Sequence, residues 1–115
     1  MIKVLIVEDN ENMRRVIRSV IGELAEVVEC EDGRDALAAY ARHQPDWVFM
    51  DIKMEGVNGI AATREIKAAF PDARIVIVTN YDDAEFREAA FKAGACDHVL
   101  KEDLLSLRRI IGQPP

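Results

Sequence analysis

The chain has 115 residues, of which 50% are hydrophobic and 31% are charged, a balance that is typical of one soluble globular domain. This composition excludes a disordered tail, a coiled coil and a collagen-like repeat. The 21 acidic residues outnumber the 15 basic ones and give a net charge of −6, which argues against binding to nucleic acid or to an anionic membrane.

The first part of the chain alternates between strand and helix patterns. Residues 2–7 are apolar apart from one lysine, which predicts a strand that is buried on both faces. Asn10 is expected to cap a helix with one apolar stripe, formed by Met13, Val16, Ile17, Val20, Ile21 and Leu24. A short strand over 26–30 follows, and Asp32 begins a second helix that ends before Pro45.

The middle of the chain continues this alternation. Residues 47–50 predict a third strand, which ends at Asp51. A glycine-containing loop leads into a helix over 60–70, which Pro71 ends. Residues 74–79, with the sequence RIVIVT, are the strongest β-branched run and predict a fourth strand.

The last part of the chain predicts two more helices around a fifth strand. Asp82 is expected to cap a helix that ends at Gly94. The side of this helix that we expect to be buried is formed by Phe86, Ala89, Ala90 and Ala93. A strand over 97–100 and a helix over 102–111 follow. Repeated strand–helix units with short links predict a single doubly wound α/β domain, with a five-stranded parallel sheet and helices on both faces.

Polar side chains follow four of the predicted strands at their carboxyl ends, where ligands bind in open parallel sheets. They are Glu8, Asp9, Asp51, Thr79 and Lys101. Three carboxylates without histidine or cysteine suit a hard divalent cation, and Mg²⁺ above all where a phosphate completes its coordination. The sequence therefore predicts a Mg²⁺ site at this edge of the sheet.

Four segments carry a resemblance to a known family: VEDN, MDIKMEGVNG, VTN and AGACDHVLKE. Together they resemble the receiver domain of two-component response regulators. The resemblance extends over nearly the whole chain, so we expect a receiver over residues 1–112, with 113–115 as a chain end or the start of a linker. It implies a flavodoxin-like sheet in the strand order 2-1-3-4-5.

The resemblance also implies roles for the residues at the strand ends. Asp51 matches the phosphoacceptor, which takes a phosphoryl group from a sensor histidine kinase or a phosphotransfer protein. Glu8, Asp9 and Asp51 match the side chains that hold Mg²⁺, together with the main-chain carbonyl of Lys53. Such a domain is a switch rather than a turnover enzyme, although family members assist their own phosphorylation and dephosphorylation.

Two further matches concern the response to phosphorylation. Lys101 matches the lysine that pairs with the carboxylate or a phosphoryl oxygen, and Thr79 matches the hydroxyl that moves to hydrogen-bond the phosphoryl group. In receivers the output surface consists of helix 4, strand 5 and helix 5, through which partners bind and homodimers form. Phe91 is either an anchor on this surface or a half-buried aromatic residue against the last helix.

Several positions depart from the usual receiver pattern. His98 replaces the common tyrosine or phenylalanine, and it is either a titratable part of the switch or a residue at a strand edge. Asn80 replaces a smaller residue and would restrict access to the phosphoryl group. Glu102 stands where proline is frequent, which puts the family's cis peptide after Lys101 in doubt. Glu55 replaces a frequent proline of the loop after Asp51.

Other functions fit less well or remain open. A phosphatase of the haloacid dehalogenase type needs a second aspartate two residues after its nucleophile, where this chain has Lys53. A flavin carrier needs a glycine-rich phosphate loop, whereas the loop after the first strand is acidic. A phosphorylation-independent interaction module is the main alternative. The chain is either a stand-alone regulator or the regulatory part of a DNA-binding one, and this domain itself is not expected to bind nucleic acid.

The cysteines and the apolar runs indicate where the protein acts. Cys30 and Cys96 are too few for a disulfide framework, and the implied strand order places them on opposite outer strands, so no disulfide is expected between them. No apolar run reaches the ~20 residues of a membrane span, and the N-terminus lacks a signal-peptide cleavage pattern. We therefore expect a cytoplasmic location without membrane association.

Overall fold

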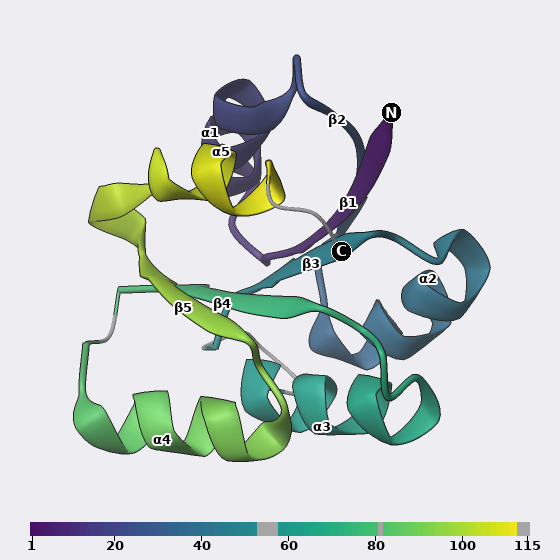
Figure 1. Ribbon diagram of the computed structural model, residues 1–115, viewed down its shortest axis with the longest axis vertical. Helices are drawn as coiled ribbons and strands as arrows, with labels where there is room; N and C mark the ends of the chain where they lie inside the picture. The colour runs from purple at the N-terminus through teal and green to yellow at the C-terminus, as the bar shows by residue number, and fades with distance from the viewer. Residues whose placement is uncertain (53–57, 81, 113–115) are drawn as a thin grey trace.

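Five parallel strands form the central sheet, in the order β2-β1-β3-β4-β5 (Figure 1). The structure is a computed structural model that describes residues 1–52, 58–80 and 82–112. The strands are β1 (Ile2–Val7), β2 (Ala25–Cys30), β3 (Trp47–Met50), β4 (Ile75–Thr79) and β5 (Asp97–Leu100). The predicted fold class and strand order are confirmed. Arg74, expected to begin β4, precedes it and lies with its guanidinium 3.9 Å from the centre of the Trp47 ring.

The helices cover both faces of the sheet. They are α1 (Glu11–Ile21), α2 (Ala36–His43), α3 (Gly59–Ala69), α4 (Ala84–Ala93) and α5 (Ser106–Ile111), with short 3₁₀ turns η1 (Gly33–Asp35) and η2 (Lys101–Asp103). In Figure 1, α1 and α5 lie on one side of the sheet, while α2, α3 and α4 lie on the other. Within the described residues, no helix is long and apolar enough to cross a membrane.

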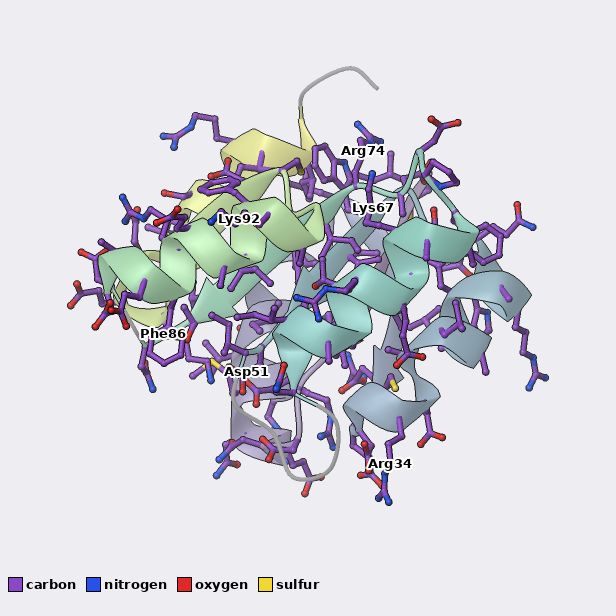
Figure 2. All side chains as sticks on the ribbon, turned by 90° about the horizontal axis from the view of Figure 1, so that it is seen from below. Arg34, Asp51, Lys67, Arg74, Phe86 and Lys92 are labelled. Carbon is purple, nitrogen blue, oxygen red and sulfur yellow. The ribbon has the colours of Figure 1, made fainter. Side chains whose placement is uncertain are left out.

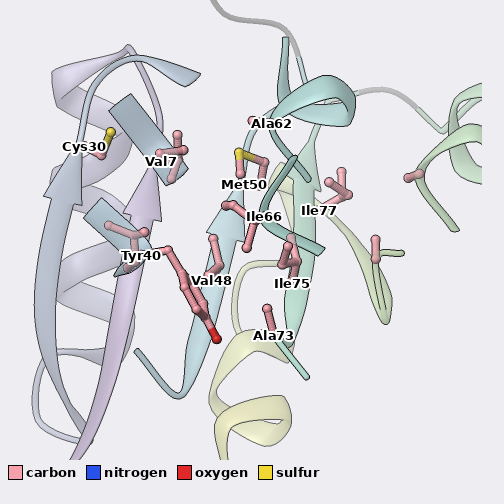
Figure 3. Packing of buried hydrophobic residues seen from close by; sticks show 14 of the residues in the cluster. Val7, Cys30, Tyr40, Val48, Met50, Ala62, Ile66, Ala73, Ile75 and Ile77 are labelled. Carbon is pink, nitrogen blue, oxygen red and sulfur yellow. The ribbon is translucent and has the colours of Figure 1, made fainter. Parts of the chain in front are cut away.

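Alternate residues of β1 enter two separate cores, because successive side chains of a strand point to opposite faces. Leu5 and Val7 belong to the core under α2, α3 and α4, part of which is shown in Figure 3. Val4 and Ile6 belong to the core under α1 and α5. All four side chains are fully buried, which confirms that the first strand is buried on both faces.

The apolar stripe of α1 is narrower than predicted. Ile17 and Ile21 are buried, but Val16 and Leu24 are 44% and 39% exposed. Val16 lies about 100° around the helix from Ile17, at the margin of the stripe. Leu24 lies beyond the end of α1, where the chain turns into β2.

The start of α4 also differs from its prediction. Asp83 is the cap, since its carboxylate accepts a hydrogen bond from the Glu85 amide at 2.8 Å, whereas Asp82 pairs with Arg87. Phe86 was expected to be buried but is 38% exposed, and Figure 2 shows it on the outer part of α4. The buried side of the helix is formed by Ala90 and Ala93, with Ala89 half-buried. Gly94 ends the helix as predicted, with a left-handed φ of 112°.

The segment after β5 is not one continuous helix. The predicted helix over 102–111 is replaced by η2, a short turn, and α5. The Ser106 hydroxyl donates to an Asp103 carboxylate oxygen at 2.6 Å, and this bond closes the turn before α5. No cis peptide bond occurs in the described residues, so the bond between Lys101 and Glu102 is trans.

Gly59, the first residue of α3, packs directly against the backbone at the end of β3. Its amide donates to the Ile52 carbonyl at 2.7 Å, and a side-chain Cβ at this position would lie 1.8 Å from the carbonyl oxygen of Asp51. Only glycine allows this approach, so Gly59 holds the start of α3 next to Asp51.

A Gly59→Ala variant is expected to lower the free energy of unfolding by about 2 kcal/mol, because the backbone must move to accommodate the methyl group. Gly112→Ala is the matched control, since a Cβ there would meet the nearest carbonyl oxygens at an ordinary 3.5 Å. Urea unfolding of both variants tests this expectation. Equal stabilities of the two variants would show that the close approach at Gly59 carries no cost.

Candidate functional site

Three carboxylates meet at the carboxyl ends of β1 and β3. Glu8 and Asp9 follow β1, and Asp51 follows β3. One oxygen from each lies within 4.8 Å of the others. The backbone continues the sheet to this point, because the Asp51 amide donates to the Val7 carbonyl at 3.0 Å. The sequence-predicted acidic cluster is therefore present, and parallel pairing of β1 with β3 brings it together.

The three carboxylates differ in burial. Glu8 and Asp51 are 2% and 6% exposed, whereas Asp9 is exposed. Figure 2 shows Asp51 beside the first turn of α3, at the edge of the sheet. Two nearly buried carboxylates next to each other are costly unless a cation neutralises them.

Lys101, which follows β5, supplies one positive charge that partly neutralises these carboxylates. Its Nζ lies 2.7 Å from Glu8 Oε1 and 3.6 Å from Asp51 Oδ2. The side chain is only 11% exposed, so the ion pairs are largely shielded from water. One ammonium therefore faces two buried carboxylates, and the site keeps excess negative charge.

The pKa values reflect this imbalance. Burial raises the pKa of the Glu8 carboxyl to about 7, with the charge of Asp51 adding to the shift and the hydrogen bond to Lys101 opposing it. Burial disfavours the charge on Lys101, but its hydrogen bond to Glu8 and the charge of Asp51 outweigh this and raise its pKa. Near neutral pH, Lys101 is therefore charged, while Glu8 is partly protonated.

The donor set fits a hard divalent cation. It offers carboxylate oxygens alone, which suit Mg²⁺ rather than a metal that prefers nitrogen or sulfur ligands. The buried, incompletely neutralised charge of Glu8 and Asp51 also favours an additional cation at this position. Lys53, whose carbonyl was predicted as a further ligand, lies outside the described residues, as does Glu55.

Thr79 lies at the same edge of the sheet. It is the last residue of β4, is fully buried, and is paired with Leu100, directly before Lys101. Asn80 follows it and is exposed. Asn80 and Lys101 line one small cavity at this edge.

His98, predicted as a switch residue or a strand-edge residue, and Phe91, predicted for the output surface, lie on β5 and α4. His98 is half-buried in β5 and lines a groove with Arg87 of α4 and Arg109 of α5. Phe91 is 46% exposed and lies beside Arg87 on the outer side of α4. This exposure favours the interpretation of Phe91 as a surface residue over that of a half-buried one.

Two residues that support the site were not predicted from the sequence. Gly59 packs against the Asp51 carbonyl at the start of α3, and the Arg14 guanidinium donates to the Glu8 carbonyl at 2.8 Å. Two sequence signals could have indicated them. Gly59 stands at the start of the helix that follows Asp51, and Arg14 lies one turn into the helix that follows Glu8 and Asp9.

Comparisons with known proteins agree on one family. The family model of the response regulator receiver domain matches residues 4–111. The chain is 39% identical to the chemotaxis protein CheY of Halobacterium salinarum, over 86% of this chain and 83% of that protein. It is 31% identical to the transcriptional regulatory protein DegU of Brevibacillus brevis, over 88% of this chain.

A solved structure gives the same result. A two-component response regulator of the LuxR family from Aurantimonas sp. SI85-9A1 superimposes with a TM-score of 0.91 and 34% identity, over 97% of this chain and 83% of that one. The chain spans less than half of the length of DegU, at 44%. It therefore matches one part of that regulator.

Proposed function

Because the chain belongs to the response regulator receiver domain family of two-component systems, we propose that Asp51 accepts a phosphoryl group in the presence of Mg²⁺. The donor would be the phosphohistidine of a sensor histidine kinase or a phosphotransfer protein. Receiver domains are generally signalling switches, and the proposal gives this chain the same role. The observation that carries it is the cluster of Glu8, Asp9 and Asp51 with Lys101 between two of its members.

The proposed transfer uses the Asp51 carboxylate as the nucleophile. One of its oxygens forms a bond to phosphorus while the bond between phosphorus and the donor nitrogen breaks, and the electron pair stays with the imidazole. Glu8 and Asp9 would hold Mg²⁺ with Asp51, and the bound ion would neutralise charge on the carboxylates and the phosphoryl oxygens. The Lys53 carbonyl remains a proposed ligand.

Lys101 and Thr79 would bind the new phosphoryl group. Lys101 already lies 3.6 Å from Asp51 Oδ2, where it can pair with an added phosphoryl oxygen. Thr79 carries the hydroxyl at the end of β4, and we propose that it donates a hydrogen bond after phosphorylation. The phosphoryl group carries nearly two negative charges where the carboxylate carried one, and this added charge favours both donors.

The proposed output is a change in the surface formed by α4, β5 and α5. His98 and Phe91 lie on elements of this surface, through which a partner or a second copy of the chain would bind. The printed name of DegU describes a transcriptional regulator. By analogy, a DNA-binding output domain in the full protein is part of the proposal, while the receiver itself would not contact DNA.

The proposal includes a cytoplasmic location. Cys30 and Cys96 are both free thiols, and they lie toward opposite edges of the sheet. Free thiols are typical of a reducing compartment.

Incubation with acetyl phosphate tests the proposal. In the presence of Mg²⁺, intact mass spectrometry is expected to show one added phosphoryl group, and peptide mapping to place it on Asp51. With EDTA in place of Mg²⁺, the adduct should be absent. An adduct that forms equally well with EDTA would contradict the proposed role of the acidic cluster.

The alternative is a receiver fold that binds partners without phosphorylation. Absence of both the adduct and Mg²⁺ binding would support this alternative. An aspartyl-phosphate phosphatase would instead show continuous release of phosphate with turnover.

A further inference from the structure

The main chain of the acidic pair is held by the side chain of Arg14. Arg14 lies in the first turn of α1, and its guanidinium reaches back to the end of β1, where Nη1 donates to the Glu8 carbonyl oxygen at 2.8 Å. The Arg14 side chain is 13% exposed, so this bond is largely shielded from water. A shielded hydrogen bond from a charged donor is stronger than a neutral one at the surface.

The position of this carbonyl restricts the directions that Asp9 can take. The Glu8 carbonyl belongs to the planar peptide that joins Glu8 to Asp9, so a bond to its oxygen sets the plane from which Asp9 departs. The amide of Glu8 is also fixed, because it donates to the Cys30 carbonyl at 3.0 Å. The exposed Asp9 carboxylate thus depends on a backbone fixed by Arg14 on one side and by β2 on the other.

Arg14 is itself held in place by β2. Its Nε donates to Glu29 Oε1 at 3.1 Å, while Nη1 makes the bond to Glu8. Lysine cannot reproduce this pair of bonds, because its single ammonium lacks the planar fork of a guanidinium. Arg18, one turn later in α1, pairs with the other carboxylate oxygen of Glu29. Among the described residues, Arg18 is therefore a neighbour that shares the acidic partner of Arg14 but has no bond to the Glu8 carbonyl.

We infer that Arg14 is a positioning residue for the Mg²⁺ site. It orients the peptide between Glu8 and Asp9 so that the Asp9 carboxylate stays within reach of Asp51. The inference rests on the proposed function, in that it requires the acidic cluster to bind Mg²⁺.

Charge and position predict opposite results for the removal of Arg14. Loss of a positive charge near a cation site strengthens cation binding by electrostatics alone. Loss of a residue that orients a ligand weakens it, typically on the order of tenfold or more. We therefore expect Arg14→Gln to raise the Kd for Mg²⁺ on the order of tenfold, whereas Arg18→Gln leaves it unchanged or lowers it.

The experiment titrates Mg²⁺ alone into ¹⁵N-labelled wild type, Arg14→Gln, Arg14→Lys and Arg18→Gln, followed by NMR. Arg14→Lys keeps the charge and is expected to weaken binding as well. In the metal-free protein, the Asp9 amide resonance should shift in both Arg14 variants and stay in place in Arg18→Gln. Urea unfolding of the metal-free variants shows that each is folded.

The outcomes separate the inference from the proposed function. Wild type that binds no Mg²⁺ would overturn both. Wild type that binds Mg²⁺, with equal affinities in the Arg14 and Arg18 variants, would overturn only the positioning role. Weaker binding in both Arg14 variants alone, with the shifted Asp9 resonance, is the result that the structure leads us to expect.

Discussion

An Asp51→Asn variant is expected to gain no phosphoryl group from acetyl phosphate and Mg²⁺. The amide cannot act as the carboxylate nucleophile, so the loss should be complete rather than partial. Asp72→Asn is the matched control, because Asp72 is an exposed residue before β4, at the opposite end of the sheet from the site. This control should accept one phosphoryl group to the wild-type extent, as measured by intact mass.

In the absence of metal, the Asp51→Asn variant is expected to be more stable than the wild type. Asp51 lies within 4.8 Å of two other carboxylates and 3.6 Å from a single ammonium, so its ionised form is repelled more than it is attracted. At an effective dielectric constant near 20, its replacement should raise the free energy of unfolding by about 1 kcal/mol at pH 8. The gain should shrink at pH 5, where Glu8 is protonated.

Urea unfolding in EDTA at the two pH values measures this gain. Loss of phosphorylation together with higher metal-free stability would show that the acidic cluster is maintained for function at a cost in stability. A phosphoryl adduct on Asp51→Asn at the wild-type level would refute the assignment of Asp51. Lower stability at pH 8 would show instead that the ion pair with Lys101 outweighs the repulsion.

The position of the site was predictable because it follows from the topology. Parallel strands place all their carboxyl ends at one edge, so assigning the ends of β1, β3, β4 and β5 already brought the polar residues together. This needed only the ends of strands, which polar residues mark clearly. Glu8 and Asp51 are the examples, since each directly follows a buried apolar run.

What the sequence did not show depends on local backbone geometry and side-chain reach. The cap of α4 is Asp83 rather than Asp82, and neighbouring aspartates have the same propensity until the backbone angles are known. Phe86 is exposed although it lies at helical spacing from Ala90, because periodicity identifies a face but not how much of it the sheet covers. Periodicity also could not predict the contact of Arg14 with Glu8, since it does not show that the long side chain turns back toward β1.

The affinity for Mg²⁺ is expected to fall steeply below neutral pH. Glu8 must be ionised to bind a cation, and burial raises its pKa to about 7. Between pH 8 and pH 5 the ionised fraction of such a group falls by about a hundredfold, so the Kd for Mg²⁺ should rise by a similar factor. Calorimetric titration of Mg²⁺ at several pH values measures this change, and a Kd that is constant over the range would contradict the pKa of Glu8.

The stability of the metal-free protein should show the opposite trend. The native state binds the Glu8 proton more tightly than the unfolded chain, where the pKa is 4.5. The stabilisation from this group is therefore complete below about pH 4.5 and is lost as the pH rises through about 7, a change of roughly 3 kcal/mol. Mg²⁺ should restore stability most at high pH, where Glu8 is ionised.

A Glu8→Gln variant isolates this contribution from the other carboxylates. In EDTA, the free energy of unfolding of the wild type should decrease from pH 5 to pH 8. This decrease should be smaller in Glu8→Gln, because the variant lacks the titrating carboxyl group. Glu65→Gln, which changes an exposed glutamate of α3, should retain the wild-type decline. If the wild type and both variants share one pH profile, Glu8 does not titrate near neutrality. A difference confined to Glu8→Gln would identify this buried carboxylate as the group that titrates near neutrality.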